Sequence, residues 1–261
     1  MDLHGKIALV TGGSGDIGGA ICDALAAAGA DVALTYVGNV EAAEASVARV
    51  AAAGRRAVAI HLDQRDEASI LAAAAELRAE FGGCDILVNN AAWNIGIPFP
   101  NLTELDAATW DRVQETNVRG PYLLARELQP ELAAGEGGRI VNIASVGGLM
   151  PGSSSIAYSC SKAALTQLCR VAALELAPHK IRVNIVHPDA VFDTKLWTPE
   201  ALLKSATRYN MTVEEYKTKN LMKVEIKSKD IGNMVAAMAS ALFAKVTGAQ
   251  IPVDGGNDRV I

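Results

Sequence analysis

Aromatic residues and cysteines are scarce in this sequence, and their scarcity limits what kind of protein it encodes. Aromatics make up 5% of the 261 residues, so Ala, Val, Leu and Ile must fill most of a core. The cysteines form no CxxC pair and have no metal-ligand spacing with the histidines. We therefore expect no metal site and four reduced thiols, as is usual in the cytoplasm, at Cys22, Cys84, Cys160 and Cys169.

Long apolar runs and a strong excess of one charge are also absent. The apolar run at 7–10 is too short for a signal peptide, and the uncharged stretch 140–161 carries Asn142, Pro151 and many Ser and Gly. The net charge is −5, and no cluster of basic residues occurs. These features predict a cytoplasmic protein that binds neither membranes nor nucleic acids.

Short apolar runs alternate with Ala-rich amphipathic stretches along most of the chain. The alternation predicts strands at 6–11, 31–36, 57–62, 85–90, 138–145, 181–187 and 249–255. It predicts helices at 16–28, 40–53, 66–81, 104–134 and 157–177. Strand–helix alternation of this kind is typical of an α/β fold with a Rossmann-type, doubly wound parallel sheet of about seven strands. We expect one domain over residues 1–261.

Residues 189–228 interrupt this pattern between the last two predicted strands. The segment follows Pro188 and is rich in Lys, Thr and Glu. Ligands of open α/β sheets bind beyond the carboxyl ends of the strands, so we interpret the insert as a substrate lid. A surface insertion without ligand contacts is the alternative.

A glycine-rich turn follows the first predicted strand. Residues 11–18 read TGGSGDIG, so Gly13, Gly15 and Gly18 have the GxGxxG spacing of dinucleotide-binding turns. Such a turn lets a pyrophosphate approach the backbone at a helix N-terminus. The second strand ends at Tyr36 with neither an acid for a ribose 2′-hydroxyl nor a cation for a 2′-phosphate. Asp16 gives a slight preference for NAD over NADP, unless it only caps the helix.

Ser145, Tyr158 and Lys162 have the spacing of a proton-transfer site. Tyr158 and Lys162 are four residues apart in a predicted helix, so they share one face. An ammonium group near a phenol lowers the pKa of the phenol toward neutrality. Ser145 ends the preceding strand, from which its hydroxyl can hold a substrate oxygen as charge develops.

Over nearly its full length the chain resembles the short-chain dehydrogenases/reductases. The matching residues are the 11–18 turn, Asp63, N89-N90-A91-A92, Asn117, Ser145, Y158-S-C-S-K162 and V253-D254-G255-G256. The resemblance implies that the tyrosine is the general acid/base, that the serine orients the substrate oxygen, and that the lysine binds the nicotinamide ribose and lowers the tyrosine pKa. It implies a proton relay through water at Asn117.

The resemblance also implies a cofactor path through the turn and three strand ends. Its residues are Gly12, Ser14, Gly15, Asp16, Ile17, Gly18, Tyr36, Asp63 near the adenine, Asn90, Ala91, Tyr158, Lys162, Pro188, Val191 and Thr194. Two departures bear on this path. Asp16 stands where the family usually has glycine, and Asp189 follows Pro188 where the family has Pro-Gly.

The chain is therefore expected to be a NAD(P)-dependent oxidoreductase that interconverts a secondary alcohol and a carbonyl. Residues 211–231 and the C-terminal VDGGNDRVI are similar to the dehydrogenase portion of bifunctional aldolase/dehydrogenases of deoxysugar catabolism, which implies a small polyol, sugar or hydroxyaldehyde. The alternatives are a 3-oxoacyl reductase acting on carrier-bound substrates and a non-catalytic nucleotide-binding sensor or scaffold.

Two further expectations concern the substrate pocket and the assembly. Trp93 follows the Asn90 turn and Trp197 lies in the insert, so both are candidates to line the substrate pocket. The family implies a homotetramer or dimer formed through the helices at 104–134 and 157–177.

Overall fold

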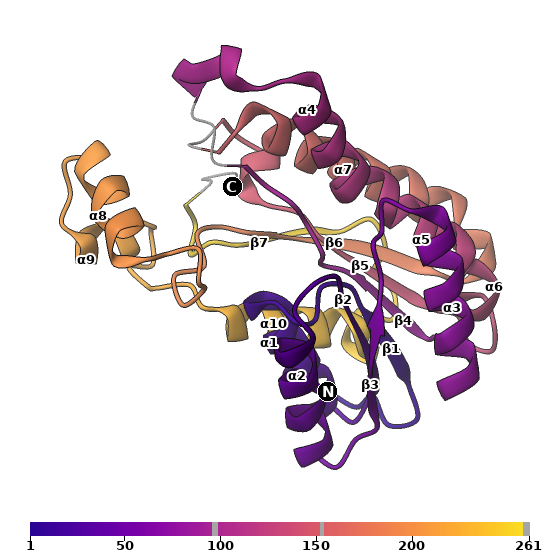
Figure 1. Cartoon of the computed structure of the whole chain (residues 1–261). Coiled ribbons are helices and arrows are strands. Elements are labelled where there is room, and N and C mark those ends of the chain that lie inside the picture. The colour runs from indigo at the N-terminus through magenta and orange to yellow at the C-terminus, as the bar shows by residue number, and fades with distance from the viewer. Residues whose placement is uncertain (96–98, 152–153, 258–261) are drawn as a thin grey trace.

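The computed structural model describes residues 1–95, 99–151 and 154–257, and its centre is a seven-stranded parallel sheet (Figure 1). The order is β3-β2-β1-β4-β5-β6-β7. The strands are β1 (Ile7–Val10), β2 (Asp31–Tyr36), β3 (Ala57–His61), β4 (Ile86–Asn89), β5 (Arg139–Ile143), β6 (Arg182–Pro188) and β7 (Gln250–Val253). The chain runs outward from β1 in both directions, so the point at which the strand order reverses lies between β1 and β4. The expected α/β fold is confirmed.

Helices cover both faces of the sheet. One face carries α1 (Asp16–Ala27), α2 (Val40–Ala52) and α10 (Ser228–Ala239), and the other carries α3 (Glu67–Phe81), α5 (Gly120–Glu127) and α7 (Ile156–Glu175) (Figure 1). Side chains of a strand alternate between faces. In β1, Ala8 and Val10 therefore join the core under α1 and α10, while Leu9 joins the core under α3, α5 and α7.

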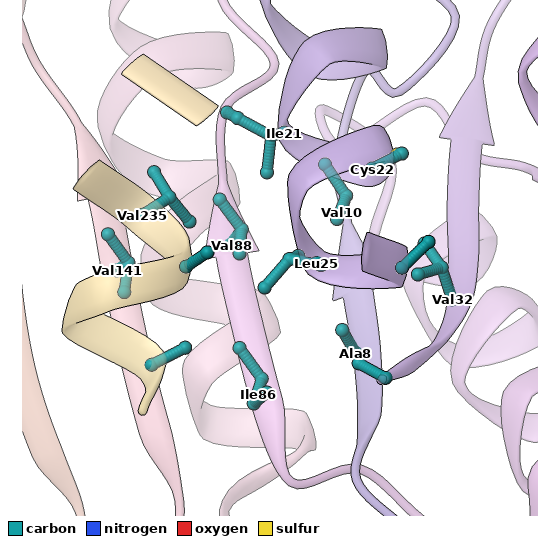
Figure 2. Packing of buried hydrophobic residues seen from close by; sticks show 14 of the residues in the cluster. Ala8, Val10, Ile21, Cys22, Leu25, Val32, Ile86, Val88, Val141 and Val235 are labelled. Carbon is teal, nitrogen blue, oxygen red and sulfur yellow. The ribbon is translucent and has the colours of Figure 1, made fainter. Parts of the chain in front are cut away.

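Small residues let α1 and α10 pack closely against each other and the sheet. Figure 2 shows Ile21 and Leu25 of α1 and Val235 of α10 directed toward Val88 and neighbouring strand residues. At Gly232 of α10, a Cβ would lie 2.4 Å from the backbone oxygen of Ala20, so only glycine allows this contact. The sequence analysis did not predict α10.

The predicted helix 104–134 is wrong as one continuous element. The structure divides it into α4 (Ala107–Gln114), a π-helical turn (Glu115–Arg119), α5 and α6 (Gln129–Leu132). Helical backbone continues from α4 through the π-helical turn into α5, with Pro121, which has no N–H, placed just after that turn. The break comes at Leu128, and Pro130 lies in the first turn of α6, where its missing N–H costs no helical hydrogen bond. The π-helical turn contains Asn117, one of the predicted site residues, and such turns often occur at functional sites.

The insert forms a small cap at the edge of the molecule (Figure 1). It contains α8 (Pro199–Arg208) and α9 (Val213–Lys217), and Phe192, Ala206 and Tyr216 form its own buried cluster. None of the helices in the described ranges combines the length and apolar character needed to cross a membrane.

Candidate active site

A cleft of about 640 Å³ lies at the carboxyl ends of β1 to β4 and reaches the start of α7. Parallel strands end at the same edge of a sheet, so turns that are distant in sequence meet there. Most of the residues expected to bind the cofactor, and one expected to contact substrate, line this cleft: Gly12, Ser14, Gly15, Asp16, Ile17, Gly18, Tyr36, Asp63, Asn90, Ala91, Tyr158, Thr194 and Trp93.

The glycine-rich turn leaves the N-terminus of α1 open toward the cleft. Gly12 has φ +65°, a conformation that favours glycine, and the N–H of Gly15 donates to the Gly12 carbonyl. A Cβ at Gly18 would lie 2.1 Å from the Gly12 oxygen, so the close approach of helix and turn requires glycine. Gly15 precedes the helix and supplies no side-chain cap, so the N–H groups of the first turn face a position suited to an anion.

Asn90 and Thr11 lock this turn onto β4. The Asn90 Nδ2 donates to the carbonyl oxygens of Thr11 (2.9 Å) and Gly12 (3.3 Å). The Thr11 hydroxyl accepts hydrogen bonds from the N–H groups of Asn90 and Ala91. In the described structure the Asn90 amide group therefore positions the turn. Sequence reasoning missed Thr11, although it directly precedes the glycines.

Asp16 binds the start of the insert and does not cap the helix. Its Oδ2 accepts a 2.7 Å hydrogen bond from the backbone N–H of Lys195. Thr194 and Leu196, which flank Lys195, line the cleft. The residue that departs from the family glycine thus connects the nucleotide turn to the cap. Asp189, the second departure, accepts a hydrogen bond from the Asn257 amide (2.7 Å) and so ties β6 to the end of the described chain.

The side of the cleft beyond β2 and β3 carries polar groups that are paired within the chain, except for the Gln64 Oε1, which has no hydrogen-bond partner among the described residues. Arg65 binds the Asp63 carboxylate through Nε (3.0 Å) and through a second guanidinium nitrogen (2.6 Å), and it holds the pKa of Asp63 below its ordinary value. Gln64 is buried, and its Nε2 donates to the backbone oxygen of Ala91. Arg65 and Gln64 line the cleft and were not among the predicted residues.

Ser145, Tyr158 and Lys162 meet at the inner end of the cleft. The Ser145 side chain lies near the Tyr158 hydroxyl and acts to lower the pKa of this phenol. The Lys162 Nζ lies 5.5 Å from the centre of the Tyr158 ring and donates a 2.8 Å hydrogen bond to the Ile143 oxygen. Lys162 is 2% exposed, and no carboxylate pairs with it among the described residues. The structure thus brings together three side chains that the sequence places on a strand end and one helix.

Burial sets the proton affinities of Tyr158 and Lys162. It raises the pKa of Tyr158 to about 12, an effect that the hydrogen bond from Ser145 opposes. It lowers the pKa of Lys162 to about 7, because a buried ammonium group loses its hydration. The expected lowering of the tyrosine pKa by the lysine depends on a protonated Lys162.

Asn117 connects the wall of the cleft to the catalytic helix. Its Oδ1 accepts from the Trp93 N–H (2.8 Å), and its Nδ2 donates to the Trp93 oxygen (3.0 Å) and the Ser161 hydroxyl (3.0 Å). The Ser161 hydroxyl in turn donates to the Tyr158 backbone oxygen (2.7 Å). Arg112 stacks over the Trp93 ring at 4.2 Å, and both line the cleft. In this structure the Asn117 side chain positions Trp93 and α7.

Six predicted residues are not among those that line the cleft: Asn117, Ser145, Lys162, Pro188, Val191 and Trp197. The first three are connected to it through Trp93 and Tyr158. Pro188 ends β6 and is buried, and Val191 belongs to the core beside α1 and α10. Trp197 packs inside the cap, with its ring centre 5.1 Å from that of Phe192. Asn94 and Leu196 line the cleft instead and carried no sequence signal that singled them out.

The described residues fit a dinucleotide. The cradle at Gly18, the open helix N-terminus and the cleft volume suit a pyrophosphate flanked by two nucleosides. Lys162 supplies a buried cation without a carboxylate partner at the end of the cleft where Tyr158 lies.

Comparison with known proteins agrees with this fit. A family profile described as enoyl-(acyl carrier protein) reductase matches residues 13–258. The chain belongs to the short-chain dehydrogenase/reductase family. The 3-oxoacyl-acyl-carrier-protein reductase FabG of Staphylococcus aureus is 34% identical over 256 residues, which cover 96% of this chain and 97% of the relative. The cis-4-hydroxycyclohexanecarboxylate dehydrogenase of Sinomonas cyclohexanicum is 36% identical, with 98% and 97% covered.

The relatives also include a longer chain. The uncharacterized oxidoreductase YuxG of Bacillus subtilis is 33% identical over 259 residues, which cover 96% of this chain but 37% of YuxG. This protein therefore spans little more than a third of the length of that relative.

Solved structures share the whole fold. A dehydrogenase/reductase from Sinorhizobium meliloti 1021 has a TM-score of 0.85 and 38% identity, with 98% of this chain and 96% of that chain covered. A blue fluorescent protein from a metagenomic library, solved in complex with NADPH, has a TM-score of 0.85 and 34% identity, with 98% and 99% covered.

Membership identifies this short-chain dehydrogenase/reductase as a NAD(P)-dependent oxidoreductase. Two finer expectations are not supported. No relative found here shows the similarity to bifunctional aldolase/dehydrogenases, and the preference for NAD loses its basis because the Asp16 carboxylate is bound to the Lys195 N–H.

Proposed function

We propose that the enzyme interconverts a secondary alcohol and a carbonyl on a small polyol, sugar or hydroxyaldehyde. The observation that carries the proposal is the grouping of Ser145 and Tyr158 beside the buried Lys162, at the end of a cleft that suits a dinucleotide. A non-catalytic nucleotide sensor has no need for this arrangement.

In the proposed reaction the nicotinamide accepts or supplies a hydride. Tyr158 removes the alcohol proton during oxidation and returns it during reduction. The Ser145 hydroxyl holds the reacting oxygen and stabilises the charge that develops on it. Lys162, when protonated, stabilises the phenolate of Tyr158, while the burial of Lys162 keeps water away from its ammonium group. Asn117 keeps Trp93 and α7 in register with the cleft.

A small substrate agrees with the walls near Tyr158. Trp93, Asn94 and Leu196 line the cleft, and Trp93 and Asn94 are hydrogen-bonded to Asn117 and to Ser155 at the start of α7. The relative from Sinomonas cyclohexanicum is named for a small cyclic secondary alcohol. The likeness of residues 211–231 to deoxysugar dehydrogenases motivates the choice of polyols and deoxysugars for assay.

The second candidate is reduction of a carrier-bound 3-oxoacyl group. It is favoured by the FabG relative and by lysines of the cap, which offer a positive surface to an acidic carrier: Lys195, Lys204, Lys217, Lys219, Lys223, Lys227 and Lys229. Four glutamates in the same segment reduce that charge: Glu200, Glu214, Glu215 and Glu225.

The test is absorbance at 340 nm with NAD and NADP, each combined with polyols, deoxysugars and hydroxyaldehydes, and with NADH and NADPH on carbonyls and 3-oxoacyl thioesters. Tyr158→Phe removes the acid/base group and is expected to abolish turnover, whereas Tyr122→Phe, on the exposed side of α5, serves as the matched control. Turnover that survives in Tyr158→Phe refutes the assignment of the acid/base group. Tight cofactor binding without turnover on any panel member refutes the enzyme and favours the sensor.

We also propose that the enzyme is a cytoplasmic homodimer or homotetramer. A groove between α5, the π-helical turn and α7 contains Tyr122 and Leu168, and nearby Leu174 is 77% exposed. Light scattering on the wild type and on Leu174→Glu tests this assembly, which predicts a smaller particle for the variant.

A further inference from the structure

His187 is a fully buried histidine for which the proposed reaction has no role. It lies on β6 between β5 and β7 and is 0% exposed. Its Nδ1 is 3.2 Å from the backbone oxygen of Ser145. Its Nε2 has no hydrogen-bond partner among the described residues.

The contact with Ser145 determines the tautomer of the ring. A carbonyl oxygen only accepts, so Nδ1 carries the proton and Nε2 is the bare nitrogen. Burial lowers the pKa of His187, and the nearby charges of Lys162 and Arg170 on α7 act in the same direction, so the ring is neutral. A buried acceptor without a partner costs stability that an apolar side chain would avoid. The useful feature of this imidazole is therefore its Nδ1–H.

The imidazole acts at the point where the backbone ladder between β5 and β6 ends. The Ala144 N–H still bonds to the Val186 oxygen at 2.8 Å. One residue further, the His187 side chain continues the connection and bonds to the Ser145 carbonyl, which also accepts from the Gly148 N–H at 2.9 Å.

The direction of the Ser145 hydroxyl depends on this backbone position. Ser145 precedes a short 3-10 helix (Val146–Gly148), and its Oγ accepts from the Gly147 N–H at 3.1 Å while it lies near enough to Tyr158 to lower the pKa of the phenol. If the Ser145 carbonyl rotates, the Cα–Cβ bond rotates with it, and the hydroxyl moves relative to the tyrosine.

We propose that His187 is a positioning residue that fixes Ser145 through its Nδ1–H and so aligns the Ser145 hydroxyl with Tyr158. The inference rests on the proposed function for its catalytic consequence. The contact between Ser145 and Tyr158 is a property of the folded chain, so it is measured without any substrate.

Three variants of His187 separate hydrogen bonding from packing. Asn places an amide N–H near the position of Nδ1, Gln places it near Nε2, and Leu fills a similar volume without a donor. The reporter is NMR of protein with ¹³Cζ-labelled tyrosine, in which Tyr158→Phe assigns the signal and Ser145→Ala defines its position when the contact is lost. His187→Leu and His187→Gln are expected to move the Tyr158 signal toward the Ser145→Ala position. His187→Asn is expected to leave it at the wild-type position.

The kinetic arm measures kcat, KM and pH profiles. A net hydrogen bond of 0.5–1.5 kcal/mol corresponds to a drop in kcat of about 2- to 10-fold in His187→Leu, with rescue in His187→Asn. The ascending limb of the oxidation profile, on which Tyr158 loses its proton, moves to higher pH, because the Ser145 hydroxyl lowers the pKa of Tyr158. KM for the cofactor stays at the wild-type value.

The outcomes of the two proposals are distinguishable. If the Tyr158 signal is the same in the wild type and in His187→Leu, or if Asn and Leu are equally impaired, the positioning role is refuted. If His187→Leu does not fold, the comparison of Asn with Gln decides the question. A wild type without turnover refutes the proposed function, whereas the NMR arm still tests His187.

Discussion

Replacement of Lys162 by methionine gives the most direct test of the electrostatics in the site. The structure buries an ammonium group with a single hydrogen-bond acceptor, the Ile143 oxygen, among the described residues. Burial lowers the pKa of Lys162 from its ordinary 10.5 to about 7. At 1.36 kcal/mol per pH unit, the difference amounts to about 5 kcal/mol over the full titration.

The direction in which the free energy of unfolding changes with pH follows from the number of protons that each state binds. Between pH 7 and 10.5 the unfolded chain binds the Lys162 proton more fully than the folded chain, so the free energy of unfolding rises with pH in this window. The part of the rise that falls between pH 7 and pH 9 is about 2 kcal/mol. Methionine has a similar length and no proton to bind, so Lys162→Met loses this contribution.

Denaturant unfolding at pH 7, 8 and 9 measures the effect at one protein concentration. The difference in unfolding free energy between wild type and Lys162→Met is expected to shift in favour of the wild type by about 2 kcal/mol from pH 7 to pH 9. Fixed costs of the substitution, such as the unpaired Ile143 oxygen, cancel in this shift. A difference that stays constant with pH refutes the reasoning and means that Lys162 keeps an ordinary pKa in the folded protein.

Other predictions address the turn, the cap and its connection. Gly18→Ala is expected to weaken NAD(P)H binding at least about 100-fold, because a Cβ 2.1 Å from a backbone oxygen forces the turn apart. Fluorescence titration measures the affinity, and Gly83→Ala, at a position where a Cβ meets no other atom, is the control. Asp16→Ala is expected to speed cofactor release about fivefold, because it loses a hydrogen bond worth about 1 kcal/mol to the Lys195 N–H. Asp16→Asn keeps an acceptor and is expected to release the cofactor at the wild-type rate. Equal release rates for Asp16→Ala and the wild type in stopped-flow measurements would contradict the link between the turn and the cap. Trp197→Ala is expected to make residues 189–228 more sensitive to limited proteolysis while the melting temperature of the sheet domain stays nearly constant, since ring stacking inside the cap contributes about 1 kcal/mol.

Much of the fold could be predicted from local pattern. β2 has the predicted bounds of 31–36, because a continuous apolar run between turn residues leaves little freedom in a buried parallel strand. Helix α3 ends at Phe81, the predicted last residue, and Gly82 follows it with φ +81°. The division of segment 104–134 was harder to predict from sequence. It depends on a π-helical turn before Pro121 and on the break between α5 and α6 at Leu128, before Pro130 in α6.

Part of the candidate site could likewise be predicted from local pattern, and part depended on tertiary packing. Spacing alone placed Tyr158 and Lys162 on one helical face, and the glycine pattern alone placed an open turn after β1. Trp197 was misplaced because its aromatic character suits a pocket and a cap core equally well, and only the packing against Phe192 distinguishes them.

By itself the sequence determined the parallel α/β order, the position of the glycine-rich turn and the residues proposed for proton transfer, since these depend on periodicity and on short spacings. Only the tertiary structure decided that Asp16 bonds to Lys195, that Asn117 bonds to Trp93 and that His187 bonds to Ser145. Each of these bonds joins groups 24 to 179 residues apart in sequence. Such partners are set by the way crossovers bring strand ends together at one edge of the sheet, which no local pattern encodes.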